Sequence, residues 1–314
     1  MGLKVLDLFC GAGGLSEGFK RAGFEIVLGI DSDKDALETF KLNHPESEII
    51  CGDVSKITKT DVKEIIGKVK IDVIIGGPPC QGFSMAGRRD PGDSRNTLIE
   101  QYLNLVSEIS PKLFVIENVK GLLSMKTKKG ESVIENIINL AEKKGYFITI
   151  YPLNAADFGV PQKRNRVFLI GCKKKDFRII PLKQKIFPVR YVLLKKEKVP
   201  DIYFYSKKRL EGFRRREKLN KKLKRGFGWQ FLNLNEPSYT ISARYYKDGA
   251  EALVKYSDRE IRMLTPEECA LIQSFPKHYK FASGKIKTYK QIGNAVPPKL
   301  AFAVAKSINI ALSH

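Results

Sequence analysis

The sequence predicts a doubly wound α/β domain that carries a second, smaller and basic lobe. Three observations support this. Short β-branched runs alternate with longer helical patterns as far as residue 171, this alternation then stops, and the stretch that follows is strongly basic. A chain of 314 residues is long enough to bury one large core and a smaller second one.

The expected strands are short apolar runs that suit buried strands of a largely parallel sheet, at residues 4–9, 25–30, 71–76, 113–116, 147–151 and 167–171. Helical patterns lie between them, at residues 14–22, 34–42, 98–109 and 131–144. Pro298 begins a last apolar stripe at residues 298–312, which suits a helix. Strands separated by helices indicate βαβ units, whose ligands bind at the carboxyl ends of the strands.

The region that follows residue 173 is interrupted by prolines and rich in aromatic residues. We expect it to form a separate lobe of short strands and loops, in which many of the aromatic side chains make a small core. We place this lobe at residues 181–285, and the larger domain at residues 1–180 and 286–314.

The charge of the chain points to a polyanionic partner. The formal net charge is +22, and residues 173–225 hold 21 basic and five acidic side chains. Nucleic acid is the first candidate for such a surface. Lysine enrichment for growth at high temperature, or a merely solvated face, remains an alternative.

The composition excludes several other classes of protein. No stretch approaches the roughly 20 apolar residues that span a bilayer, and the first residues lack the pattern of a secretion signal, so we expect a cytoplasmic protein that does not contact membranes. The five cysteines include no C-x-x-C pair, which argues against a disulfide framework and a metal site. Most of them should be buried.

A glycine-rich turn follows the first strand, with the sequence FCGAGG at residues 9–14. Glycines at such a turn let the backbone approach a ligand, and the next helix offers free N–H groups. Asp31 ends the second strand, where a carboxylate can bind ribose hydroxyls, and Asp53 lies where the next strand should end. This pattern indicates an adenosine-bearing ligand but leaves a nicotinamide oxidoreductase possible.

A cysteine follows the strand at 71–76 in the sequence GGPPCQGFS, residues 76–84. Two prolines fix the backbone before Cys80 and glycines clear its surroundings, which a cysteine used only for packing does not need. Glu117 ends a neighbouring strand and should reach the same crevice, although it could also cap a helix. Arg164 and Arg166 precede another strand, where a surface cation pair is the alternative.

These blocks resemble the ordered motifs of the C5-cytosine DNA methyltransferase family, of the prokaryotic restriction-modification type. The matching segments are DLFCGAGGLSEGF (7–19), GGPPCQGFS (76–84), ENV (117–119), QKRNRV (162–167), RMLTPEECALIQSFP (262–276) and QIGNAVPP (291–298). The resemblance implies a Rossmann-like, S-adenosylmethionine-dependent catalytic domain with a basic target-recognition domain. It implies methyl transfer to carbon 5 of a flipped-out cytosine in a specific double-stranded DNA sequence.

The chemistry explains why these residue types are needed. Carbon 5 of cytosine becomes nucleophilic only after a thiolate adds to carbon 6, and the resemblance gives that role to Cys80. It gives Glu117 the contact with N3, Arg166 the contact with O2, and Arg164 the ordering of the site or the binding of a phosphate.

The resemblance also implies which residues hold S-adenosylmethionine. Phe9 would pack on the adenine, the glycines would approach the methionine portion, Asp31 would bind the ribose, and Asp53 and Val54 would read the adenine edge. The full expected set is Phe9, Gly11, Gly13, Gly14, Asp31, Asp53, Val54, Pro79, Leu98, Asn294 and Val296. Ser32 departs from the family, which often has a bulky residue after the ribose-binding acid.

In the basic lobe, residues 237–245 resemble the family's recognition region, and Thr240 and Arg244 are the candidates for DNA contact. We expect Arg262, Glu267 and Gln273 to organise the lobe through buried hydrogen bonds.

Double-stranded DNA is therefore the expected partner. A cognate restriction endonuclease that acts on the same site is the second expected partner, and we expect the enzyme to be a monomer. A transfer RNA cytosine methyltransferase and a catalytically silent DNA-binding homologue are the alternatives.

Overall fold

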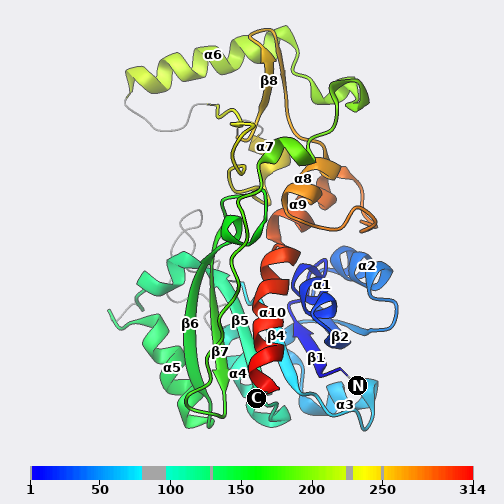
Figure 1. The fold of residues 1–314 in the computed structure, drawn as a ribbon, viewed down its shortest axis with the longest axis vertical. Coiled ribbons are helices and arrows are strands. Elements are labelled where there is room, and N and C mark those ends of the chain that lie inside the picture. The colour runs from blue at the N-terminus through cyan, green and yellow to red at the C-terminus, as the bar shows by residue number, and fades with distance from the viewer. Residues whose placement is uncertain (1, 80–96, 128–129, 224–228, 249–250, 314) are drawn as a thin grey trace.

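The computed structural model describes residues 2–79, 97–127, 130–223, 229–248 and 251–313. Cys80, the predicted nucleophile, lies outside these ranges, as do residues 81–84 of its motif. In Figure 1 the molecule is elongated, with a sheet and its helices at one end of the long axis and the basic lobe at the other.

The sheet has seven strands in the order β3-β2-β1-β4-β5-β7-β6. Their bounds are β1 Lys4–Leu8, β2 Glu25–Asp31, β3 Glu48–Cys51, β4 Val73–Gly76, β5 Leu113–Val119, β6 Phe147–Asn154 and β7 Asn165–Cys172. The first five strands in this order are parallel, whereas β7 runs antiparallel to both β5 and β6. The prediction of a doubly wound, largely parallel sheet is confirmed, and β3 is the strand that was expected, without stated bounds, to end near Asp53.

Helices cover both faces of the sheet. One face packs against α1 (Gly14–Arg21), α2 (Lys34–Asn43) and the C-terminal α10 (Pro298–Leu312). The other packs against α3 (Lys59–Ile66), α4 (Thr97–Ile109) and α5 (Val133–Lys143). Successive residues of β1 alternate between the two cores, with Val5 in one and Leu6 in the other, as strand geometry requires. The expected helices are confirmed, and α3 is an additional one.

The basic lobe has a core of its own. It contains α6 (Lys207–Lys222), α7 (Tyr245–Asp248), the hairpin of β8 (Val254–Ser257) and β9 (Glu260–Arg262), and α8 (Pro266–Ile272). Helix α9 (Lys285–Asn294) also packs here, through Tyr289 and Ile292. The aromatic core is confirmed by buried Tyr203, Tyr205 and Tyr245. The expectation of only short strands and loops is wrong, because α6 is a helix of 16 residues.

A buried ion pair organises this lobe. Arg262 and Glu268 are both fully buried, and the shortest of their contacts joins Nη1 to Oε2 at 2.7 Å. The carboxylate of Glu268 also accepts the backbone N–H groups of Leu194 and Thr265. The prediction for Arg262 is confirmed, but that for Glu267 is wrong, because Glu267 is exposed. Thr265 caps α8 and its capping box uses the third helical residue, which turns Glu268 inward and Glu267 outward.

Other features of the prediction can be checked directly. Gln273 is buried and donates to the carbonyl oxygen of Ala295, as expected. Cys10, Cys172 and Cys269 are buried, whereas Cys51 is exposed. In the described part of the chain, no helix has the length and apolar character that crossing a membrane would require.

We predict that Glu268→Ala lowers the free energy of unfolding by about 3–5 kcal/mol, because it leaves the buried guanidinium of Arg262 without its partner. The neighbouring variant Glu267→Ala should change it by less than about 0.5 kcal/mol, since that side chain faces solvent. Urea denaturation of both variants measures the difference. Equal effects of the two substitutions would contradict the assigned roles.

Candidate active site

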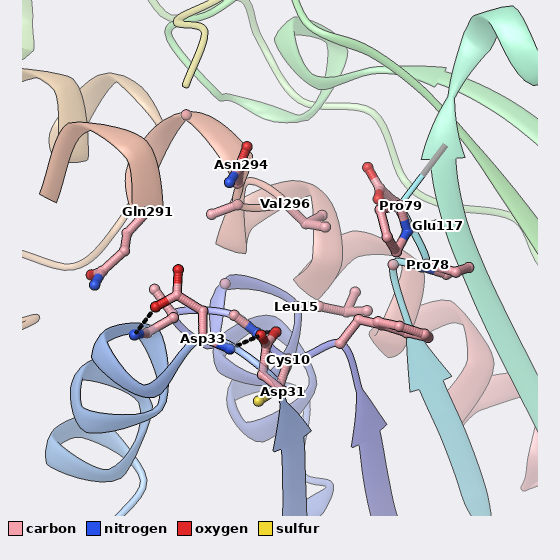
Figure 2. A pocket seen from close by; sticks show the side chains of 18 of the residues that line it. Cys10, Leu15, Asp31, Asp33, Pro78, Pro79, Glu117, Gln291, Asn294 and Val296 are labelled. Atoms are coloured by element: carbon pink, nitrogen blue, oxygen red, sulfur yellow. Dashed lines mark hydrogen bonds between the residues drawn. The ribbon is translucent and has the colours of Figure 1, made fainter. Parts of the chain in front are cut away.

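A cavity of about 430 Å³ lies at the carboxyl ends of the parallel strands. Its walls come from the turn after β1, the end of β2, residues 77–79 after β4, the end of β5, the start of β7 and residues 290–296. Figure 2 shows Asp31 and Asp33 on one side, Glu117 and Pro79 on another, and Asn294 and Val296 across from them. Ten predicted residues line it, namely Phe9, Gly11, Gly14, Asp31, Pro79, Glu117, Arg164, Arg166, Asn294 and Val296.

The glycine turn forms one wall. Gly11 has a φ of 52°, and a Cβ atom placed on it would meet nothing within 4 Å, so the backbone here borders open space. Gly14 begins α1, and a Cβ atom on it would collide with the carbonyl oxygen of Val296. This glycine therefore allows the C-terminal segment to close over the turn.

Asp31 is fixed to this turn. Its Oδ2 accepts the backbone N–H of Gly11 at 2.8 Å, and its Oδ1 accepts that of Asp33 at 2.8 Å. Burial raises the pKa of Asp31, while these two hydrogen bonds oppose the shift. The carboxylate is thus oriented before any ligand arrives, at the wall where a ribose is expected.

Four of the predicted cofactor residues lie outside the lining formed by the described residues. The space beside Gly13 is filled by Tyr279 and His44. Asp53 is exposed and caps the short helical turn at 54–56, and the side chain of Val54 is buried in the core. Leu98 lies on α4.

The sequence interpretation missed several wall residues, among them Asp33 and Gln291. Asp33 caps α2 by accepting the N–H of Ala36. Its position two residues after Asp31 and directly before a helical pattern was a usable signal.

Glu117 and Arg166 form an ion pair in the cavity, with 2.8 Å between Oε1 and Nε. They come from the neighbouring antiparallel strands β5 and β7, where Val119 lies opposite Arg166 and Glu117 lies opposite Phe168. All four side chains therefore project from the same face, and the pair is diagonal. Burial raises the pKa of Glu117, and the two arginines Arg166 and Arg164 oppose that rise.

The segment that leads to Cys80 is held beside Glu117. Asn118 donates from its amide to the carbonyl oxygen of Pro78 at 3.2 Å. A Cβ atom on Gly77 would lie 3.2 Å from Oε2 of Glu117, so the absent side chain lets the backbone pass next to the carboxylate. Pro79, the last described residue before Cys80, therefore lies at the edge of the cavity.

Arg164 is buried and links three separate segments of the chain by hydrogen bonds. Its guanidinium donates to the carbonyl oxygens of Ile241, Gly293 and Ala295, at 3.1, 2.8 and 3.1 Å. It is only 2% exposed, which suits the ordering role and excludes a grip on an outside phosphate. Of its three guanidinium nitrogens, Nε has no hydrogen-bond partner among the described residues.

The predicted recognition segment, residues 237–245, lies directly beside the segment that carries Arg164 and Arg166. The N–H of Ser238 donates to Pro161, and the N–H of Lys163 donates to Ser238. Thr240 is exposed and its hydroxyl donates to the carbonyl oxygen of Lys163 at 2.7 Å. Arg244 is exposed as well. Both candidates for DNA contact thus lie at the surface, and Thr240 lies beside the segment that carries Arg164 and Arg166.

The described residues contain no group of His, Cys, Asp and Glu side chains arranged to hold a metal ion.

Beneath the glycine turn, Asp7 is fully buried in β1. Its Oδ2 accepts the hydroxyl of Ser16 at 2.6 Å, and among the described residues its Oδ1 has no hydrogen-bond partner. Burial raises the pKa of Asp7 to about 8. At neutral pH the folded protein therefore holds this carboxyl in its neutral form.

Comparison with known proteins gives concordant results. The sequence profile described as C-5 cytosine-specific DNA methylase matches residues 3–309. Among curated proteins, Type II methyltransferase M.NlaX of Neisseria lactamica is 36% identical, with 99% of this chain and 97% of the relative covered. Type II methyltransferase M1.ScrFI of Lactococcus lactis subsp. cremoris is 34% identical, with 97% and 77% covered.

Among solved structures, a candidate DNA modification methyltransferase encoded within an Escherichia coli prophage superposes with a TM-score of 0.76. It is 28% identical, and both chains are covered completely.

We predict that Asp7→Asn becomes more stable relative to the parent protein as pH rises from 5 to 7. The folded pKa lies above the unfolded value, so the folded protein retains a proton that the unfolded chain releases, and rising pH favours unfolding until about pH 8. An amide lacks this dependence. The difference in unfolding free energy should grow by up to about 1.4 kcal/mol per pH unit.

Asp72→Asn is the control, because the backbone N–H of Lys4 and the ammonium of Lys112 lower the pKa of Asp72. The ionised Asp72 stops contributing to stability only as pH falls through the acid range. The difference in unfolding free energy between Asp72→Asn and the parent protein should therefore stay constant between pH 5 and 7. Urea denaturation across this range gives both curves. A flat curve for Asp7→Asn would show that the carboxyl is ionised in the folded state.

Proposed function

Because the chain belongs to the C-5 cytosine-specific DNA methylase family, whose methyl donor is S-adenosylmethionine, we propose that it methylates a flipped-out cytosine in a specific double-stranded DNA sequence. The observation that carries the proposal is the Glu117–Arg166 pair, held in a cavity at the strand ends beside the segment that leads to Cys80.

The cavity fits the methyl donor in size and chemistry. Its volume of about 430 Å³ lies in the range of small-molecule sites. The open space beside Gly11 leaves room for a ligand against the backbone, and the oriented carboxylate of Asp31 can accept hydrogen bonds from ribose hydroxyls. We assign Phe9 to the adenine face, and Pro79, Asn294 and Val296 to the remaining walls.

S-adenosylmethionine supplies an electrophilic methyl carbon. The protein has to make carbon 5 of cytosine nucleophilic, and we assign this to Cys80, whose thiolate forms a bond to carbon 6 and pushes an electron pair toward N3 and carbon 5. After methylation, loss of the carbon 5 proton returns an electron pair to the ring and expels the Cys80 thiolate. The acceptor of that proton is not assigned.

Glu117 is suited to the ring nitrogen. Since burial raises its pKa, this carboxyl can share a proton with N3 as negative charge develops on the ring. Arg166 keeps the carboxyl in place through the 2.8 Å ion pair, and we assign it a contact with the cytosine O2. Arg164 positions the wall without touching the base, because its two terminal nitrogens are engaged with backbone carbonyls.

The second lobe is proposed to grip DNA. We propose residues 1–180 and 286–314 as the catalytic domain and residues 181–285 as the target-recognition domain, with Thr240 and Arg244 at the DNA. Nearly all of helix α9 falls on the catalytic side of this boundary, although its Tyr289 and Ile292 pack in the core of the lobe. A base inside a duplex hides its reactive face, so the nucleotide has to rotate out before carbon 6 can be attacked. The Type II names of the relatives support a partner restriction endonuclease, and we propose a monomer that acts in the cytoplasm.

We predict that a duplex with 5-fluorocytosine at the target position, mixed with S-adenosylmethionine, becomes covalently joined to the protein through position 80. Fluorine cannot leave as the proton does, so the adduct is trapped. Bisulfite sequencing of DNA from cells that express the protein first identifies the site, and denaturing electrophoresis with peptide mapping then locates the bond.

Cys80→Ala should form no adduct and transfer no methyl group, while it keeps most of its DNA affinity, which phosphate contacts supply. Cys51→Ala removes an exposed thiol elsewhere in the chain and should form the adduct normally. If the parent protein formed no adduct with its mapped site and the methyl donor, the proposed chemistry would be wrong. Labelling of transfer RNA in place of duplex DNA would instead reassign the substrate.

We also predict that Glu117→Gln lowers kcat by a factor of about 10² to 10⁴, because an amide cannot share a proton with N3. DNA affinity should stay within about a factor of two, since the carboxyl lies inside the cavity. The exposed Glu135→Gln serves as the control and should be fully active. Unchanged turnover in Glu117→Gln would remove this glutamate from the chemistry.

A further inference from the structure

Helix α6 carries far more positive charge than its place in the fold requires. Nine of its 16 residues are Lys or Arg and two are Glu. All nine cationic side chains are exposed. Figure 1 shows the helix at the end of the long axis opposite α3, with α7, α8 and α9 lying between it and the sheet.

One side of α6 is anchored to the lobe. Leu210 is buried, and the ring of Phe213 lies 5.3 Å from that of Tyr205 and 5.7 Å from that of Trp229. The indole N–H of Trp229 donates to Glu217 at 3.0 Å. These contacts hold the helix against the lobe along a single stripe.

The opposite side carries a row of cations. Lys208, Arg215 and Lys222 follow one another at intervals of seven residues, so they lie nearly in line along the helix. On a helical projection this line lies across from Leu210 and Phe213. At 1.5 Å per residue, neighbouring members are about 10 Å apart and the row spans about 21 Å. Among the described residues, no hydrogen bond or ion pair is formed by these three side chains.

This arrangement does not serve the stability of the helix. Its first turn contains three cations and no acid, where the helix dipole favours the reverse. Two acids cannot form an ion-pair network with nine cations, so a thermostabilising network does not account for the charge. The like charges repel one another and persist at some cost in free energy.

The outward face also lacks the apolar residues of a membrane-binding helix, because Leu210 and Phe213 are directed into the lobe and only Leu219 lies near the row. A regularly spaced cationic row with a single apolar neighbour matches instead the phosphate backbone of a duplex, which carries one charge per about 1.7 Å of axis.

We propose that the outer face of α6 binds the phosphates of double-stranded DNA flanking the target site, independently of sequence. This inference rests on the proposed function. The helix increases affinity for DNA of any sequence and leaves both the chemistry and the choice of target to residues nearer the cavity. It therefore forms a second DNA-contact surface, in addition to the recognition segment around Thr240.

The test compares the full-length protein with Lys208→Gln/Arg215→Gln/Lys222→Gln. Its matched control, Lys63→Gln/Lys68→Gln/Lys70→Gln, removes three exposed charges around and beyond α3 at the other end of the molecule. Fluorescence anisotropy with a random-sequence duplex of about 30 base pairs gives the dissociation constant as a function of salt, without any need for activity.

The α6 variant should bind this duplex about tenfold or more weakly, and its plot of log affinity against log salt should be shallower by about 2–3. The control variant should match the parent. On the mapped target, the α6 variant should show an increased KM for DNA with unchanged kcat, and bisulfite sequencing should find the same methylated sequence. Its thermal midpoint should not fall, since glutamine is a good helix former and repulsion is relieved.

An affinity and salt slope equal to those of the control variant would overturn the proposal. A loss of affinity for transfer RNA with no loss for duplex DNA would overturn it as well. A parent protein that binds no duplex DNA would overturn the proposed function itself, which is a separate outcome. An altered target sequence would show that α6 reads bases.

Discussion

The arrangement of the site depends on the buried guanidinium of Arg164. Moving such a charge out of water is costly unless its donors are satisfied, and here its terminal nitrogens donate to three carbonyl oxygens from two distant parts of the chain. One of these, Ile241, belongs to the recognition segment, and the other two, Gly293 and Ala295, flank Asn294 in the cavity wall. A single side chain thereby fixes the two segments against the strand that carries Arg166.

This connection places recognition and chemistry on one short piece of backbone. Lys163 accepts the hydroxyl of Thr240, Arg164 binds Ile241, and Arg166 pairs with Glu117. The segment around Thr240 is therefore hydrogen-bonded to residues within three positions of Arg166, which pairs with Glu117. Close packing reinforces the link, because Gly293 has no room for a side chain beside the backbone of Ala243.

The sequence was sufficient for the features that local chemistry determines. The glycine turn, Asp31 and the acid at the end of β5 follow from strand-end geometry, and the structure brings Gly11, Asp31 and Glu117 to one cavity. The sequence was insufficient where tertiary packing decides which of two adjacent residues is buried. Glu267 and Glu268 are chemically identical, and only the capping box with Thr265 shows which one turns inward. Asp53 ends its segment as a cap, which strand-end reasoning alone does not distinguish from a ligand-facing acid.

Helix α6 is an element that the sequence analysis did not predict. Its weak apolar stripe hides it from a periodicity argument, although its lysines, arginines and leucines favour helix and Ser206 caps its start. The same weakness identifies its role, since a helix held by so little apolar surface has most of its circumference available for a partner. The cavity holds both signs of charge, because Asp31 and Glu117 line it together with Arg164 and Arg166, and burial raises the pKa values of the two acids. The nine cations of α6 lie outside it and face solvent, where a polyanion can reach them. The paired charges of the cavity hold its walls in place, whereas the cationic row of α6 remains free to meet phosphates.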